Sequence, residues 1–87
     1  MMDMRYKKNP MIIERQHADA TVLIDPYRRT MILLDPVARE IWGALDGTRS
    51  VADIMALLKD GFEVDEPTLH KDVTVFLNDL VKREIIR

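Results

Sequence analysis

The apolar pattern of this chain changes abruptly at the pair Asp35-Pro36. The five residues before it, 30–34, carry no charge and are typical of a short β-strand. After it, residues 37–45 place their apolar side chains at helical spacing. Asp35 can accept the free N–H groups of a first helical turn, and Pro36 has the φ that this position needs. The sequence therefore predicts a strand that turns directly into a helix. That strand is either buried on both faces or left as a sheet edge that awaits a partner.

Two further apolar runs precede this strand. Residues 11–15 are a short strand candidate, and residues 21–24 are β-branched and apolar. Short polar connections with turn residues separate the runs, so the pattern predicts an antiparallel three-stranded meander. Residues 1–10 are polar and charged and end at a proline, and we expect them to form a flexible N-terminal arm, from which Tyr6 could dock.

The rest of the chain predicts three helices. The first ends at residues 46–47, an Asp-Gly pair whose glycine suits a left-handed position. The second begins with a capping box formed by Ser50 and Asp53, and the third begins near residues 65–67 with an acidic cap and a proline. The inward residues expected on the second helix are Val51, Ile54, Met55, Leu57 and Leu58. One stripe of the third carries Leu69, Val73, Phe76, Leu77, Leu80 and Glu84, and because all but Glu84 are apolar we expect it to be the core helix.

Together these elements predict one small domain over residues 11–87. Its class is α+β, with a three-stranded antiparallel N-terminal sheet packed on three helices. The helical part resembles a winged helix-turn-helix.

The composition argues against catalysis. The chain has no cysteine in 87 residues, which excludes disulfides and thiolate chemistry. His17 and His70 lack metal-ligand spacing, Ser50 is explained by helix capping, and the three glycines are isolated, so none forms a phosphate-binding loop. We therefore expect a binding module that is not an enzyme and has no metal or cofactor. The charged start and the lack of a long apolar run predict a cytoplasmic protein without a membrane partner.

The third predicted helix carries a second stripe outside its core face. Its members are Thr68, Asp72, Val75, Asp79 and Arg83. The stripe is either an ordinary solvated face or, if it borders the free edge of residues 30–34, one wall of a groove. An extended peptide could add to that edge through its backbone, with Val75 and Ile32 or Leu34 as apolar contacts.

A winged helix-turn-helix also allows nucleic-acid recognition as the alternative function. Its recognition helix would be residues 67–83, with Lys71, Lys82 and Arg83 as phosphate contacts. Two aspartates on the same helix would repel phosphate, and a net charge of −2 supplies no basic excess. We therefore expect no nucleic-acid partner.

Three blocks of residues follow one another at regular intervals. They are Leu34-Asp35-Pro36-x-Ala38-x-x-Ile41-Trp42, Leu45-Asp46-Gly47-x-x-Ser50-Val51-x-x-Ile54 and Asp72-Val73-x-x-Phe76-Leu77-x-x-Leu80. Together they resemble the PqqD family, which includes the pyrroloquinoline quinone biosynthesis protein D and related peptide-recognition domains. The resemblance extends over residues 27–86.

The resemblance implies a peptide chaperone without a cofactor. Such a protein binds the leader segment of a ribosomally synthesised precursor peptide between its third strand and last helix, and presents it to a modifying enzyme, often a radical S-adenosylmethionine (SAM) protein. Carried over by position, the strand contacts are Met31, Ile32, Leu33 and Leu34. The helix contacts are Asp72, Val75 and Asp79, followed by Lys71 and Lys82.

The turn over residues 25–29 departs from the family pattern. It has no glycine and lacks the aromatic-rich sequence of members from quinone or lasso-peptide pathways. The pathway, the precursor and the enzyme therefore stay open, as does the choice between monomer and homodimer.

Overall fold

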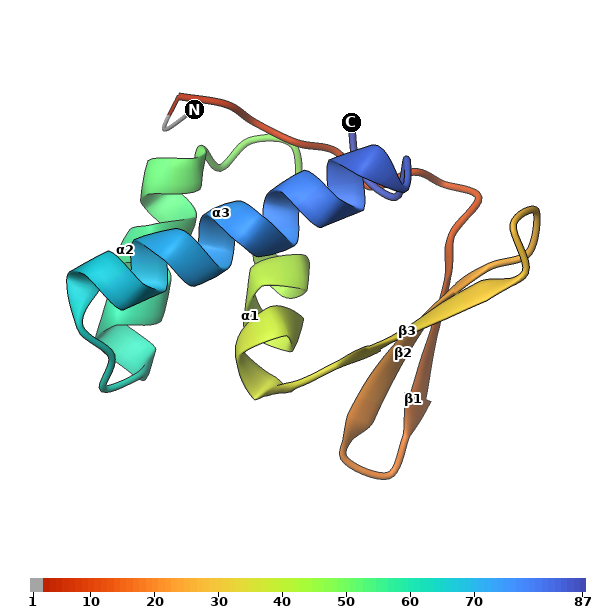
Figure 1. Ribbon diagram of the computed structural model, residues 1–87, viewed down its shortest axis with the longest axis horizontal. Helices are drawn as coiled ribbons and strands as arrows, with labels where there is room; N and C mark the ends of the chain where they lie inside the picture. The colour runs from red at the N-terminus through yellow and green to blue at the C-terminus, as the bar shows by residue number, and fades with distance from the viewer. Residues whose placement is uncertain (1–2) are drawn as a thin grey trace.

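The computed structural model describes residues 3–87, which form a three-stranded antiparallel sheet followed by three helices (Figure 1). The strands, in sheet order, are β1 (Ile13–His17), β2 (Ala20–Asp25) and β3 (Thr30–Leu34). The helices are α1 (Pro36–Ala44), α2 (Val51–Gly61) and α3 (Glu66–Lys82). The α+β class and the order of elements predicted from the sequence are confirmed. Within residues 3–87, no helix is long and apolar enough to cross a membrane.

The strand β1 lies two residues later than the sequence predicts. A tight turn at residues 18–19, where Ala18 takes a left-handed φ of 54°, lets β1 continue to His17. The register pairs Leu23 with Glu14 of β1 and with Ile32 of β3. These three residues therefore share the face of the sheet that meets the helices.

The junction between β3 and α1 has the cap that the sequence predicts. Asp35 accepts a hydrogen bond of 2.7 Å from the backbone N–H of Ala38, and Pro36 occupies the first helical position. Further along α1, the buried Trp42 donates a hydrogen bond of 2.6 Å from Nε1 to Oε1 of Glu14. This bond joins the first strand to the first helix and fixes the sheet against the helical bundle.

The core lies where the three helices meet the inner face of the sheet. Val73, Leu77 and Leu80 of α3 are fully buried at its centre. Leu57, which was expected to point inward, does not, and the stripe of α3 ends before Glu84. Leu57 is 50% exposed because it lies about 100° around α2 from the buried Leu58. Glu84 is exposed because α3 ends at Lys82 and the chain then turns away from the helical register.

Residues 3–10, expected to be a flexible arm, are paired in the structure. The backbone N–H of Lys7 donates to the carbonyl of Arg87 at 2.6 Å, and the N–H of Arg87 donates back at 2.9 Å. Tyr6 docks into the core and is only 8% exposed. The arm therefore lies beside the C-terminal tail and covers the core (Figure 1). Residues 1–2, the start of the expected arm, lie outside the described residues.

Asp46 organises the connection between α1 and α2. Its Oδ1 accepts hydrogen bonds from the N–H and hydroxyl of Thr48, at 2.9 and 2.8 Å, and from the N–H of Arg49 at 3.1 Å. The bonds from Thr48 are the main reason that the pKa of Asp46 is lowered to about 2. Gly47 follows with a φ of 85°, the left-handed conformation that the sequence predicts for it.

We expect Asp46→Asn to reduce the loss of stability in acid. A carboxyl with a lowered folded-state pKa stabilises the protein above its unfolded pKa of about 4, and this contribution is lost as the pH falls toward the folded value of about 2. The unfolding free energy of the variant should therefore fall less steeply over this window. Urea denaturation at a series of pH values gives the unfolding free energy of the parent and of the variant against pH. Equal dependence on pH in the two proteins would contradict the prediction.

We expect Leu77→Ala to lower the unfolding free energy by about 2–5 kcal/mol, because the side chain is fully buried and its removal leaves a cavity. The matched control is Val75→Ala, two residues away on the same helix at an exposed position, which should change it by less than about 0.5 kcal/mol. Urea denaturation compares the two. Similar losses in both variants would mean that the packing of α3 is misassigned.

Candidate functional site

The strand β3 is an open edge of the sheet. It pairs with β2 on one side, and the sheet order places no other described strand beside it. The N–H and C=O groups along its outer edge are therefore available to an added strand. Figure 1 shows this edge running without a loop from the β2–β3 turn into α1.

The predicted strand contacts divide between the two faces of the sheet. Leu34 is buried, 4% exposed, and Ile32 is half-buried against the core. Met31 and Leu33 lie on the outer face, where they are 69% and 70% exposed. The sequence alone does not separate these two pairs, because all four residues are apolar.

The outer face of the sheet is apolar beyond the edge strand. Opposite Met31 and Leu33, the register places Ile24 and Val22 of β2, both partly exposed. An antiparallel sheet with one face on the core normally carries polar residues on the other. The exposed apolar row along β3 therefore marks a surface suited to binding.

The predicted helix contacts lie on the side of α3 away from the core. Val75 is 60% exposed, and the flanking Asp72 and Asp79 are exposed as well. Asp79 forms an ion pair with Arg83, with 3.1 Å between Oδ2 and Nε. Asp72 has no ion pair within the described part of the chain, so its carboxylate is the more available of the two.

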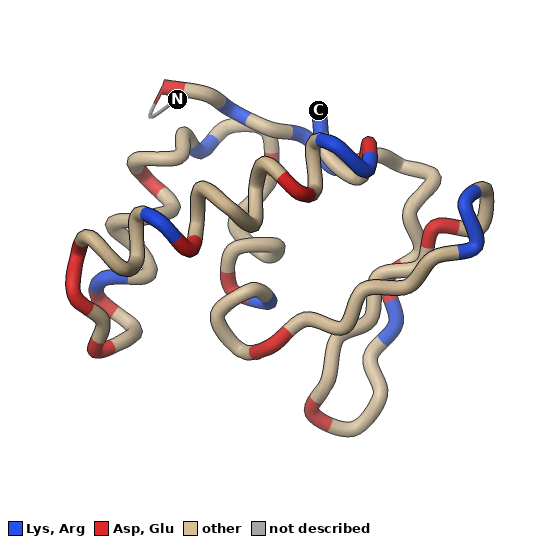
Figure 2. The backbone as a smooth tube through the Cα atoms, viewed as in Figure 1, with Lys and Arg blue, Asp and Glu red and all other residues tan. Residues whose placement is uncertain are grey.

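Charges of both signs occur along α3. Lys71 and Lys82, the remaining predicted contacts, are exposed at opposite ends of the stripe. Figure 2 shows acidic and basic residues interspersed along this helix, with two adjacent basic residues, Lys82 and Arg83, at its C-terminal end. A nucleic-acid-binding helix would be expected to present a basic face.

Arg28 links the two predicted walls at one end. From the β2–β3 turn, its Nη1 donates to Oδ2 of Asp25 and to the carbonyl of Arg83, both at 3.2 Å, and its guanidinium pairs with Glu84. The turn before β3 is thereby bound to the C-terminal end of α3. No hydrogen bond or ion pair in residues 3–87 joins a predicted strand contact directly to a predicted helix contact.

Asp25 supports this link from within the turn. Its Oδ1 accepts hydrogen bonds from the N–H groups of Tyr27 and Arg28, at 3.0 and 3.1 Å. The bond from the Arg28 N–H is the main cause of its lowered pKa, which keeps the carboxylate charged beside the guanidinium. The sequence predicts the turn role of Asp25. The pairing of Arg28 with Glu84 leaves no local pattern in the sequence from which it could be predicted, because the two residues are 56 positions apart.

The described residues contain no candidate metal site. Within residues 3–87, no group of three or more His, Asp or Glu side chains is placed to hold a metal ion. His17 lies at the end of β1 and His70 on α3, and both are exposed. The arrangement of β3 and α3 thus offers hydrogen-bonding backbone, apolar side chains and carboxylates, which are the means of peptide recognition.

Comparisons with known proteins find solved structures of similar fold. The chain is similar to the solved structure of TbiB1 in complex with the TbiA(beta) leader peptide, with a TM-score of 0.81 and 26% identity over 93% of this chain and 94% of that one. It has the fold of a lasso peptide synthetase B1 complexed with the leader peptide, with a TM-score of 0.84 and 21% identity over 97% of this chain and 99% of that one. Comparison with curated proteins finds no match.

The family comparison covers most of the chain. The model of the family described as coenzyme PQQ synthesis protein D (PqqD) matches residues 20–86, which include β2, β3 and all three helices. The resemblance drawn from the three sequence blocks is confirmed, and the chain belongs to the PqqD family.

Proposed function

We propose that this protein is a non-catalytic peptide chaperone. It binds the leader segment of a ribosomally synthesised precursor peptide at the edge of β3 and presents it to a modifying enzyme. The observation that carries the proposal is the open, apolar edge of β3 in a chain similar to two proteins whose structures contain leader peptides.

The leader adds to the sheet as a fourth strand. Its backbone pairs with the outer edge of β3, which gives affinity with little demand on sequence. Because side chains alternate along a strand, every second residue of the leader lies over the outer face beside Met31 and Leu33. The others point toward the helices, where Ile32 forms the apolar floor. Leu34 contributes through its backbone, since its side chain is buried in the core.

The helix α3 supplies the second wall of the groove. Val75 offers an exposed apolar contact, and Asp72 and Asp79 suit a basic residue of the leader. Lys71 and Lys82, at the two ends of the stripe, suit acidic residues that flank it. Selectivity among leaders comes from these side chains and not from the paired backbone.

The protein acts through proximity and carries out no chemical step. A module that holds both a leader and an enzyme raises the local concentration of the precursor core at the enzyme's active site. The proposed enzyme is a radical SAM protein, in line with the family resemblance. The protein needs no cofactor for this role, acts in the cytoplasm, and works as a monomer or homodimer.

We expect Leu33→Asp to weaken leader binding by about tenfold or more, because it places a charge in the apolar row beside the added strand. Leu33 is a better probe than Ile32, whose side chain packs against the core. The matched control is Leu57→Asp, an exposed leucine on α2, which should leave leader affinity unchanged. Calorimetric titration with the leader of the precursor encoded beside this protein measures both. Equal affinities for Leu33→Asp and the parent would move the site away from β3.

The helix wall is tested with Val75→Arg, which we expect to weaken leader binding to a similar degree, because the added cation opposes the basic residue that the carboxylates attract. Titration of the ¹⁵N-labelled parent with the same leader should shift NMR signals of β3 and of the exposed face of α3. Signals that move instead at Lys71, Lys82 and Arg83 on addition of duplex DNA, and not with leader, would favour the nucleic-acid alternative.

A further inference from the structure

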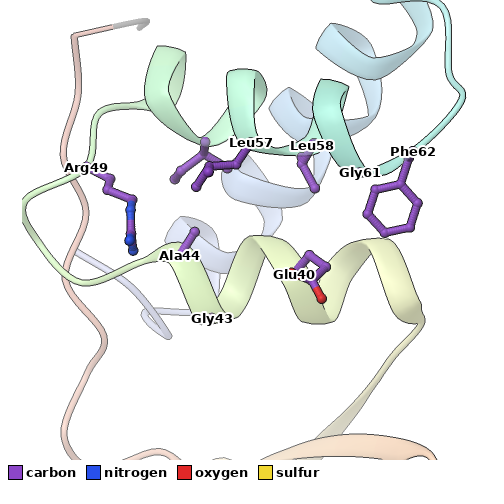
Figure 3. A pocket seen from close by; sticks show the side chains of 9 residues that line it. Glu40, Gly43, Ala44, Arg49, Leu57, Leu58, Gly61 and Phe62 are labelled. Atoms are coloured by element: carbon purple, nitrogen blue, oxygen red, sulfur yellow. The ribbon is translucent and has the colours of Figure 1, made fainter.

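A cleft of about 520 Å³ lies between α1 and α2, outside the groove of β3 and α3 (Figure 3). All of its lining residues fall between Glu40 and Phe62, on the two helices and the segments that flank them. The helix α3 passes behind α2 in this view (Figure 3). The cleft and the leader groove therefore use different elements, and both can be occupied at once.

Part of the cleft wall is apolar and comes from α2 and the residue that follows it. Leu57 is 50% exposed, and Phe62 lies at the far end and is only partly buried (Figure 3). Packing within the chain accounts for Leu58, which is buried, but not for the exposed face of Leu57. An exposed leucine and a partly buried phenylalanine that line the same concave site are typical of contacts for apolar side chains.

Gly43 leaves one side of the cleft unfilled. It lies inside α1 without a left-handed φ, and a Cβ added to it would meet no atom within 4 Å. Glycine weakens a helix relative to alanine, and here neither the backbone nor a neighbour requires it. The space over Gly43 permits another chain to approach the helix closely.

The two ends of the cleft carry opposite charges. Arg49 lies at one end and Glu40 toward the other (Figure 3). Arg49 pairs with Asp46 at 3.2 Å but stays 45% exposed. Glu40 is exposed and has no ion pair within the described residues. A partner segment is therefore complementary if it is apolar in the middle, basic toward Glu40 and acidic toward Arg49.

We propose that this cleft docks a surface helix of the modifying enzyme. The inference rests on the proposed function, because presentation of a leader requires a second surface that holds the enzyme. The docking helix carries apolar side chains one turn apart against Leu57 and Phe62, and packs closely over Gly43. A basic residue of the helix faces Glu40 and a carboxylate faces Arg49.

The test uses two cleft variants of the full chain, Gly43→Arg and Leu57→Asp. The control is Ala56→Arg, which adds the same charge at an exposed position of α2 that does not line the cleft. Gly43→Arg is expected to fold, because its side chain enters open space, and circular dichroism checks each variant. The probes are the purified modifying enzyme and the leader encoded beside this protein, each titrated separately.

We expect both cleft variants to weaken enzyme binding by about tenfold or more, with leader affinity unchanged and the control like the parent. Enzyme affinity that is unchanged in both folded cleft variants overturns the inference, as does a parent that binds no enzyme. Loss of leader affinity in the cleft variants also overturns it, because the leader would then occupy the cleft. If the unsubstituted protein binds the enzyme through the cleft but binds no leader, the proposed function is contradicted and the cleft inference is not.

Discussion

The capped junction at Asp35 determines how the open edge of β3 is presented. Its hydrogen bond of 2.7 Å to the N–H of Ala38 starts α1 directly after β3, so no loop separates the edge strand from the helical bundle. Arg28 holds the other end of the strand through Glu84 and the carbonyl of Arg83. An edge fixed at both ends is already in the conformation that the proposed strand addition needs, which lowers the entropic cost of that proposed binding.

Features set by neighbouring residues could be predicted from the sequence. The bounds of β3 and the caps of α2 and α3 agree with the structure, because each depends on residues within one turn of the chain. Features set by distant residues could not. The pairing of Lys7 with Arg87 gives no local pattern, so residues 3–10 were expected to be free. The exposure of Leu57 depends on how α2 packs against its neighbours.

The candidate site was predictable as a set of elements, but the part that each residue takes was not. Periodicity and the family resemblance select β3 and the outer stripe of α3. They do not show that Leu34 is buried while Leu33 is 70% exposed, because the direction of each side chain depends on which face of the sheet meets the helices. Nor do they show that Asp79 is already paired with Arg83. The residue that links the two walls, Arg28, has a partner that only the folded chain brings close.

Some of the exposed apolar residues lie on surfaces where stability does not explain them. Met31 and Leu33 border an open strand edge, and Leu57 borders a cleft above a helical glycine that no neighbour requires. Polar residues at these positions would cost the fold little and would reduce the risk of aggregation. Because β3 and the cleft lie on different elements, occupation of one leaves the other accessible. In the function proposed above, this small domain holds a peptide and an enzyme together and carries out no chemical step itself.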